Sequence, residues 1–349
     1  MDDDTKNLVF GIFMKNYNLR VKKILGKGGF GEVREIEFKG KTYAGKLVKK
    51  MKWKNNLYKV EEDIEKKIII GLKGPKIVKV FKIYEETYKD ETYILYIMEK
   101  AYLKDLKTLI KFLFEDSSLI NKAFCETIGD NLLKFFVKQI IDSLELLDRN
   151  NYLHFDIKPE NILNNLEINL KLSDFGLLRD VSNIDSMRIP GGTPGYLSPE
   201  YYLHQKLSVD RAKKQDVFAL GCTIYYLKYG QKMLKVHSDE SDREKRENII
   251  FSLQRKITYI QSNKICDRDF VNFLCSLIQI YPDDRSSFEQ IYRNIWVNKN
   301  SEYIKNIFEG HRDDERKLMI ELKKSDFLVE KKIENKKRNI KKQKFIFKK

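Results

Sequence analysis

The chain has 349 residues, a formal net charge of +16 and four cysteines, a length that suits one two-part catalytic domain with a short extension. The cysteines show no paired spacing and the four histidines are scattered, which excludes a disulfide framework and a zinc-finger pattern. No run approaches the ~20 apolar residues of a membrane span, and the acidic start is unlike a secretory signal. We therefore expect a soluble cytoplasmic protein, with the nucleus as an alternative.

The first informative segment is a glycine-rich loop, residues 26–33. It reads Gly26, Lys27, Gly28, Gly29, Phe30, Gly31, Glu32 and Val33. Glycines at G-x-G-x-x-G spacing let backbone N–H groups approach phosphate oxygens without interference from a Cβ atom. Dinucleotide-binding folds have the same spacing between a strand and a helix, but here residues 19–25 and 33–38 both read as strands. The sequence therefore predicts a hairpin that cradles phosphate.

The next elements are a strand over 42–48 that carries Lys46 and a helix over 60–72. A lone lysine on a strand is usually a solvated surface charge. Only the position of Lys46 after the glycine-rich loop indicates a functional role. The helix offers three glutamates: Glu61, Glu62 and Glu65. An apolar strand over 93–99 and a helix over 106–114 follow, and apolar residues at three- and four-residue spacing predict a further helix over 132–147.

That last helix leads into the most informative segment, residues 153–165, which reads LHFDIKPENILNN and is followed by SDFG at 173–176. The carboxylate of Asp156 can accept a proton from an attacking hydroxyl, and the ammonium of Lys158 can offset charge on a phosphate. Asn161 and Asp174 offer the hard oxygen ligands that Mg²⁺ prefers. Either fragment alone could be an ordinary polar turn. Both fragments in this order predict phosphoryl-transfer chemistry.

Downstream, residues 177–195 are polar and lack periodicity, and the segment closes with GTPGYLSPE at 192–200. An apolar helix signal begins near Asp216, and Arg285 stands in a DDRS motif at 283–286. From residue 17 to 297 these signatures stand in the order found in eukaryotic protein kinases, and the chain resembles a serine/threonine member of that family. The Lys158-Pro159-Glu160-Asn161 form of the loop carries the serine/threonine resemblance.

The resemblance implies an α+β bilobal fold. A small antiparallel-sheet lobe with one helix spans 17–100, and a larger, mostly α-helical lobe spans 101–297. An N-terminal extension, residues 1–16, precedes them and carries no clear signal, and a basic tail, residues 298–349, follows. The family uses ATP and Mg²⁺ and acts on protein substrates with Ser or Thr acceptors. We expect a monomer.

Carried over by motif, the resemblance assigns catalytic roles to Asp156, Lys158 and Lys46, with Glu65 as the ion-pair partner of Lys46 and Glu62 as the fallback. It assigns the metal to Asn161 and Asp174. It assigns the nucleotide to the glycine-rich loop and to further residues on strands and the hinge: Ala44, Lys46, Met98, Glu99, Ala101, Asp105 and Leu163. Asp105 could instead, or as well, begin a helix as its N-cap.

The family pattern also implies structural roles. His154 should pack in an apolar column with Ile69, Val80 and Phe175 rather than act as a base. Asp216 should hold the backbone of the catalytic loop, which we define as residues 153–165. Glu200 and Arg285 should form a buried ion pair.

Two departures from the family stand out. Gly45 replaces a small apolar residue and should loosen its strand slightly. Phe155 replaces the arginine that in the family normally pairs with a phosphate on the activation segment, which corresponds here to residues 177–195. We therefore expect activity without phosphorylation of that segment. Ser182, Ser186 and Thr193 are available hydroxyls, but Thr193 should bond within the loop beside Asp156 and Lys158.

For substrates, Leu197 suggests an apolar pocket after the acceptor, and Asp105 with Glu160 suggests a mild preference for basic residues before it. Gly195 and Tyr226 replace acids that strongly basophilic relatives carry, which weakens that preference.

The basic tail is concentrated at residues 331–349, where ten Lys and Arg stand against one acid, giving +9. Three interpretations of this tail stay open. It is a solvated, partly helical tail, or it serves nuclear import or binding to anionic polymers or membranes, or it docks on the kinase-like domain. The alternatives for the whole chain are a pseudokinase that scaffolds partners, a nucleic-acid-binding module and a small-molecule or lipid kinase.

Overall fold

The computed structural model describes residues 2–28, 31–50, 74–101, 105–115, 122–164, 169–262 and 267–298. Residues up to Asn298 form one compact unit. The basic tail and the predicted helix over 60–72 lie outside the described residues, so Glu65, Glu62 and Ile69 are not placed. Within the described ranges, no helix is both long enough and apolar enough to cross a membrane.

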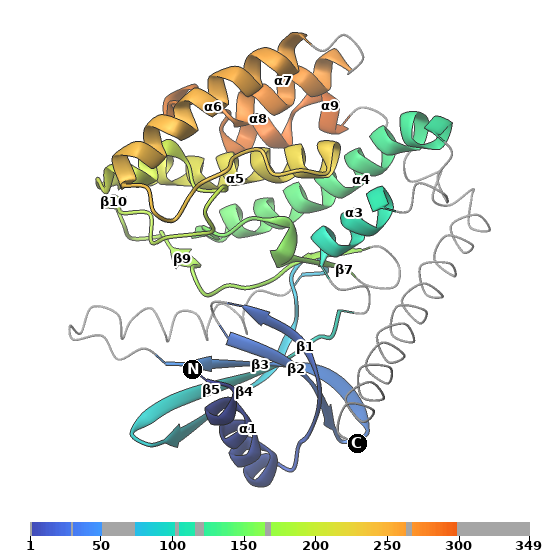
Figure 1. Ribbon diagram of the computed structural model, residues 1–349, viewed down its shortest axis with the longest axis vertical. Coiled ribbons are helices and arrows are strands. Elements are labelled where there is room, and N and C mark those ends of the chain that lie inside the picture. The colour runs from blue at the N-terminus through green and yellow to red at the C-terminus, as the bar shows by residue number, and fades with distance from the viewer. Residues whose placement is uncertain are drawn as a thin grey trace, which may run out of the picture. The chain divides into compact units, whose positions relative to one another are not determined.

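The first part of the unit is a five-stranded antiparallel sheet with the order β1-β2-β3-β5-β4 (Figure 1). Its strands are β1 (Arg20–Gly28), β2 (Gly31–Phe38), β3 (Lys41–Lys49), β4 (Val80–Tyr88) and β5 (Glu91–Met98). The predicted hairpin on either side of the glycines is confirmed, since β1 and β2 pair down to Gly28 opposite Gly31.

The cross-strand register gives this sheet two different faces, because paired residues point to the same side. Glu32 pairs with Leu47, and Leu47 pairs with Leu95. One residue further along, Val33 pairs with Lys46 and lies on the opposite face. We call the face with Glu32 the covered face and the face with Lys46 the nucleotide face.

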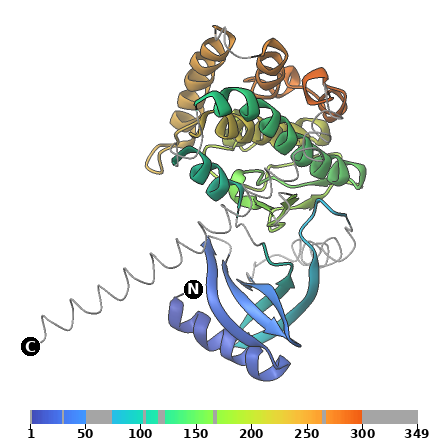
Figure 2. The same ribbon diagram turned by 90° about the vertical axis from the view of Figure 1, so that its right-hand side faces the viewer.

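A helix that the sequence did not reveal packs on the covered face. Helix α1 (Asp3–Tyr17) begins at the N-cap Asp2, whose side chain accepts the Thr5 backbone N–H at 2.7 Å. It buries Val9, Phe10 and Phe13 in a core shared with strand residues: Leu19, Ile36, Leu47, Tyr93, Leu95 and Ile97. The helix lies on the side of the sheet away from the helical part of the chain (Figures 1 and 2). The N-terminal residues are therefore part of the sheet's core.

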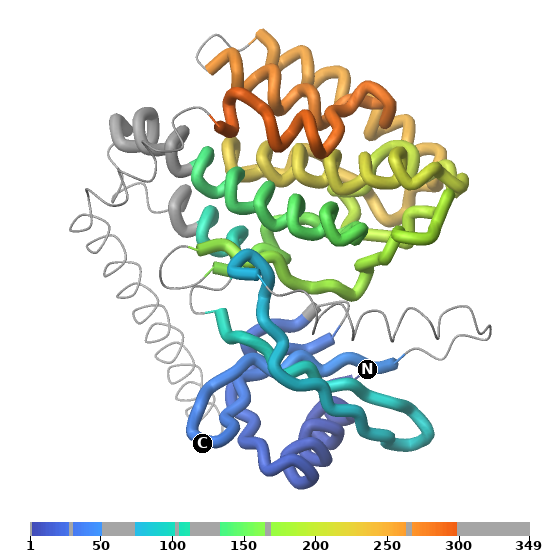
Figure 3. The backbone as a smooth tube through the Cα atoms, turned by 180° about the vertical axis from the view of Figure 1, so that it is seen from behind, coloured from blue at the N-terminus to red at the C-terminus, as the bar shows by residue number. Residues whose placement is uncertain are grey.

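The second part of the unit is mostly helical. Its helices are α3 (Leu106–Glu115), α4 (Lys122–Arg149), α5 (Val209–Tyr229), α6 (Asp242–Ser262), α7 (Arg268–Leu277), α8 (Phe288–Tyr292) and α9 (Ile295–Asn298). Figure 3 shows α4, α5 and the pair α6 and α7 stacked in succession. Helix α5 begins at the N-cap Ser208, earlier than the apolar signal near Asp216 indicates. Nearly every residue from Gln215 to Leu227 is buried, so this helix is the centre of the helical core.

Short elements connect α4 to α5. The strand pairs are β6 (Tyr152–Leu153) with β9 (Arg179–Asp180), β7 (Ile162–Asn164) with β8 (Leu170–Leu172), and β10 (Ser186–Met187) with β11 (Leu207–Ser208). Two short 3₁₀ turns, η2 (Pro159–Asn161) and η3 (Pro199–Leu203), lie in the same stretch, and a third, η4 (Pro282–Asp284), lies between α7 and α8. The small pairings hold both ends of the catalytic loop and of the segment that follows it.

A buried ion pair joins η3 to Arg285, the residue after η4, as the family resemblance implies. Both terminal nitrogens of Arg285 donate to the Glu200 carboxylate, at 2.6 and 2.8 Å. The Arg285 guanidinium also donates to the Gln279 and Ile280 carbonyls and lies over the Phe218 ring. Because every donor has a partner of suitable geometry, the charge is tolerated in the core.

Candidate functional site

The glycine-rich loop is described except for Gly29 and Phe30, which lie outside the described residues. Gly31 has φ +145, and a Cβ built there would lie 2.2 Å from the Leu47 carbonyl oxygen. Only glycine allows the hairpin to approach β3 this closely. Gly31 therefore packs directly on β3 at the point where the sequence predicts a phosphate cradle.

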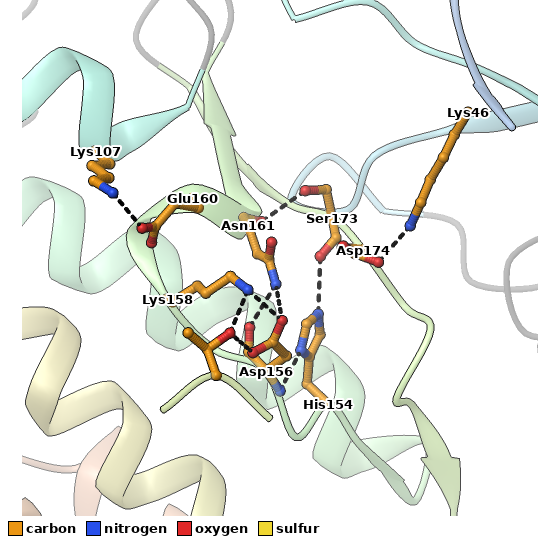
Figure 4. Close-up of polar contacts among 10 residues, drawn as sticks. Lys46, Lys107, His154, Asp156, Lys158, Glu160, Asn161, Ser173 and Asp174 are labelled. Carbon is orange, nitrogen blue, oxygen red and sulfur yellow. Dashed lines mark hydrogen bonds and ion pairs between the residues drawn. The ribbon is translucent and has the colours of Figure 1, made fainter. Parts of the chain in front are cut away.

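Lys46 extends from β3 toward the segment after β8. Its Nζ lies 2.5 Å from Oδ1 of Asp174, and both side chains are largely buried (Figure 4). Burial favours the neutral carboxyl of Asp174, but the neighbouring Lys46 outweighs it and lowers the pKa of Asp174 below its ordinary value. The sequence predicts Glu65 as the partner of Lys46. That residue is not among those described, so the pairing stays a prediction.

The backbone of the catalytic loop is held by Asp216 of helix α5, as predicted. Its two carboxylate oxygens accept the backbone N–H groups of His154 at 2.7 Å and Phe155 at 2.8 Å. Burial raises the pKa of Asp216 to about 7, against the two backbone donors, which lower it. Phe155 has φ 63, a left-handed conformation that costs a non-glycine residue energy and persists only when the surroundings enforce it.

Asp156 lies at the centre of a network of donors (Figure 4). Lys158 Nζ donates to its Oδ2 at 2.7 Å, and the Asn161 amide donates to the same oxygen at 2.8 Å. The Thr193 hydroxyl donates to Oδ1 at 2.7 Å and accepts from Lys158 at 2.5 Å. The expected contact of Thr193 with both residues is therefore confirmed. The network fixes the carboxylate in one orientation.

Asn161 is oriented by the same network. Its side-chain nitrogen also donates to the Asp156 carbonyl at 2.8 Å, so its amide oxygen points away from Asp156 (Figure 4). Its own carbonyl accepts from the Ser173 backbone N–H and hydroxyl, at 2.9 and 2.8 Å. These bonds join the two fragments that the sequence sets apart, residues 153–165 and 173–176.

His154 is fully buried, and its ring centroid lies 5.5 Å from that of Phe175. The ring accepts from the Asp156 backbone N–H at Nδ1, and Nε2 meets the Ser173 carbonyl at 3.0 Å. With Nδ1 accepting, Nε2 carries the proton. Burial lowers the pKa of His154 and keeps it neutral. It therefore packs and braces the loop, as predicted.

The other residues that the resemblance assigns to the nucleotide lie on the nucleotide face of the sheet and at the end of that face. Ala44 pairs with Met98 across β3 and β5, on the face that carries Lys46. The Glu99 N–H donates to the Lys79 carbonyl at 2.8 Å, and its carboxylate meets Lys171 at 2.6 Å. Leu163 bridges to Asp105, which brings β7 beside the start of α3. Ala101 is among the described residues, and its assignment stays a prediction.

Asp105 lies at the start of helix α3, in agreement with the interpretation of this residue as an N-cap. Its Oδ1 accepts the Thr108 backbone N–H at 2.7 Å. Nearby, Lys107 on the same helix pairs with Glu160 at 2.8 Å (Figure 4). The hydrogen bond to Glu160 raises the pKa of Lys107. No local sequence pattern marks Lys107 or Lys171, because each pairs with a glutamate more than fifty residues away.

The donor set fits a magnesium nucleotide. Among the described residues, no three His, Cys, Asp or Glu side chains gather into a metal-binding group. Mg²⁺ in nucleotide sites needs less, since one or two protein oxygens suffice when phosphates and waters complete its shell. The Asp174 carboxylate and the Asn161 amide oxygen are suited to that part, and Lys46 suits phosphate oxygens.

Comparison with known proteins gives a consistent result. The family model described as "Protein kinase domain" matches residues 19–297. An Aurora kinase of Eremothecium gossypii is 26% identical over 298 residues, which cover 83% of this chain and 72% of that protein. G protein-coupled receptor kinase 4 of Rattus norvegicus is 30% identical over 230 residues, covering 65% of this chain and 37% of that protein.

A third relative is the serine/threonine-protein kinase ppk21 of Schizosaccharomyces pombe. It is 29% identical over 281 residues, which cover 77% of this chain and 45% of that protein. The chain thus spans less than half of two of these three curated relatives. The shared part is the segment that holds the network around Asp156.

Proposed function

The chain belongs to the protein kinase family, and from that premise we propose that it transfers the γ-phosphoryl group of ATP to Ser or Thr hydroxyls of proteins. The observation that carries the proposal is the convergence of Asp156, Lys158 and Thr193 within 2.7 Å of one another, beside the oriented amide of Asn161. A scaffold has no physical need for this set of residues. Phosphoryl transfer needs positioned charge above all.

Each side chain has a defined part in this proposal. Asp156, fixed by three donors, accepts the proton of the attacking hydroxyl. Lys158 and Lys46 offset negative charge on the phosphates from two sides. Asn161 and Asp174 supply oxygens to Mg²⁺, which when bound neutralises phosphate charge. Glu65 stays the predicted second partner of Lys46.

We further propose that the enzyme needs no phosphate on its activation segment. Phe155, which replaces the usual arginine, is almost fully buried and cannot bind a phosphate. The segment is instead held by the β6–β9 and β10–β11 pairings and by the Thr193 hydroxyl. Treatment of the purified protein with phosphatase should leave its rate unchanged. Loss of activity on that treatment would contradict the proposal.

Substrate preference for upstream basic residues should be mild. Glu160, one of two candidate acids for it, is already paired with Lys107. A substrate arginine must compete with that lysine, and Lys107→Ala should therefore strengthen the preference in a peptide library. An acidic preference at these positions would overturn the assignment.

The experiment that tests transfer itself uses radiolabelled ATP and generic protein acceptors. Wild type should label them, and Asp156→Asn and Asp174→Ala should each lower the turnover by about 10²-fold or more. A pseudokinase that scaffolds partners predicts no transfer by any of the three proteins. The two functions are thereby separated.

For the basic tail we propose an accessory role in binding an anionic partner. Its excess of +9 over residues 331–349 suits an anionic partner, such as nucleic acid, an import receptor or a membrane surface. Binding to any such partner should weaken steeply as salt concentration rises. Affinity independent of salt would contradict this part.

A further inference from the structure

Helix α1 is anchored to the sheet by apolar packing along most of its length. Val9, Phe10 and Phe13 are each at most 1% exposed and lie against the covered face. At the end of the helix, the Tyr17 ring stacks on Tyr84 of β4 with centroids 4.0 Å apart. Burial on this scale fixes the helix on the sheet.

The beginning of α1 meets the glycine-rich loop through charged side chains. Asp3 pairs with Lys27 of the loop at 2.7 Å and with Lys6 at 2.9 Å. The hydrogen bond from Lys27 is the main cause of a lowered pKa of Asp3, to about 2. Lys6 and Lys27 also approach Glu32, at 3.8 and 3.5 Å. The helix and the loop thus share one cluster of alternating charge.

Arg34 extends this cluster along β2. Its Nε donates to Glu32 at 2.5 Å, and its terminal nitrogen donates to Asn7 of α1 at 2.6 Å. The guanidinium also lies over the Phe10 ring, 4.4 Å from the centroid. Arg34 therefore ties Glu32 to α1 by a polar and an aromatic contact.

Glu32 is the buried carboxylate at the centre of this charge cluster. Its side chain is 0% exposed although it carries a charge, and its Oε2 accepts no hydrogen bond from the described residues. Its charge is balanced by three cations, of which Lys6 comes from α1. Without them the buried carboxylate would be strongly unfavourable. Glu32 is therefore held mainly by Arg34 of its own strand, and α1 adds the cation of Lys6 and, through Asn7, a hydrogen bond to Arg34.

The position of Glu32 in the chain transmits this restraint to the nucleotide face. It follows Gly31, which packs directly on β3, and precedes Val33, which pairs with Lys46. Glycine-rich backbone has many accessible conformations, and binding must pay to order it. A restraint on Glu32 from the covered face lowers that cost, which is preorganisation.

We propose that α1, acting through Glu32, is a positioning element that holds the glycine-rich loop ready for nucleotide phosphates. The proposal rests on the proposed phosphotransferase function, because it assigns the loop to nucleotide. Helix α1 touches no reacting atom, so its effect should fall on nucleotide affinity rather than on the transfer step.

The test measures ADP binding with Mg²⁺ by calorimetry on the full chain, together with turnover at saturating ATP. The double variant Lys6→Met and Asn7→Ala removes the contact of α1 with Glu32 in the loop and its contact with Arg34, the residue that bonds Glu32. Lys6 is half-buried and Asn7 is exposed, and neither belongs to the core. We expect its Kd for ADP to rise about three- to thirtyfold. The turnover at saturating ATP should stay within about twofold, since no catalytic group is touched.

A matched control is Lys15→Met, an exposed lysine of the same helix in its last turn. It should leave the Kd for ADP unchanged. A second variant, Glu32→Gln, keeps the shape and removes the charge. If Glu32 transmits the restraint, adding the two α1 substitutions to Glu32→Gln should weaken binding by much less than they do alone.

The outcomes are distinct. A double variant that binds ADP like wild type overturns the inference, whether or not its unfolding temperature falls. A purely structural role predicts that lower unfolding temperature without a change in Kd. If wild type itself binds no ADP and transfers no phosphate, the proposed function fails first.

Discussion

The two halves of the site are held in different ways. In the helical half, the catalytic loop is fixed by buried polar groups, with Asp216 accepting two backbone N–H groups of the loop. In the sheet half, the described part of the glycine-rich loop is held from the covered face by α1 and a partly exposed charge cluster. Buried, fully bonded groups leave little freedom to move. Partly exposed ion pairs are weaker and easier to rearrange.

This difference matches the work assigned to each half. Proton acceptance by Asp156 requires one fixed geometry, and misplacement of a reacting group is costly in rate. Under the proposed function, nucleotide enters and leaves at the glycine-rich loop, so that loop needs a restraint it can partly release. Each of the following experiments is designed to break or sharpen this contrast.

The largest effect on stability should come from the Glu200–Arg285 pair of the helical half. Glu200→Ala leaves a buried guanidinium without its carboxylate, which should cost about 3–5 kcal/mol in the free energy of unfolding. Urea unfolding measures it, with Arg293→Ala, whose partner Glu289 is exposed, as the control. A loss below ~1 kcal/mol would mean that the helical half is not held by its buried charges.

An intermediate effect should come from Gly45 on the covered face. A Cβ there would lie 2.4 Å from Ile36 Cγ1 and 3.3 Å from Leu95. Gly45→Ala should therefore cost about 1–3 kcal/mol through overpacking, despite alanine's lower entropic cost of folding. In an Ile36→Ala background the added methyl has room, so the same substitution should cost less or stabilise. Additive effects in this double-mutant cycle would contradict the packing argument.

The smallest effect should be a pH dependence from His154. Burial lowers the pKa of His154 below its ordinary value of 6.5, so the folded chain excludes a proton that the unfolded chain accepts. Stability is unaffected by this group well above pH 6.5 and falls as the pH drops below it, by up to about 1.4 kcal/mol per pH unit. Urea unfolding between pH 7.5 and 5.5 should show a shallower fall for His154→Asn. Equal slopes would mean that the imidazole is protonated in the folded chain.

The same contrast explains what could be predicted from sequence. The catalytic loop was predictable because Asp156, Lys158 and Asn161 are neighbours in the chain, so their bonds follow from one short motif. The Glu200–Arg285 pair spans 85 residues, and only the family resemblance predicted it. Its confirmation shows that the resemblance extends to the buried framework.

Helix α1 was missed for a physical reason. Its signals, the N-cap Asp2 and apolar residues at Val9, Phe10 and Phe13, are weak without knowledge of the sheet they cover. The sequence predicts that Gly45 loosens its strand. In the structure, the absence of a Cβ atom at Gly45 makes room for the Ile36 side chain beneath α1. Both features depend on packing between distant segments, which spacing along a chain does not encode.

The most direct test asks whether the helical half sets the turnover and the sheet half sets the nucleotide affinity. It measures the turnover at saturating ATP and the Kd for ADP with Mg²⁺, both for Asp156→Asn and for the double variant Lys6→Met with Asn7→Ala. The account predicts that Asp156→Asn loses turnover by about 10²-fold or more with its Kd nearly unchanged, and that the double variant shows the reverse pattern. If both proteins lose the same parameter, or if Asp156→Asn transfers phosphate at the wild-type rate, the account is contradicted.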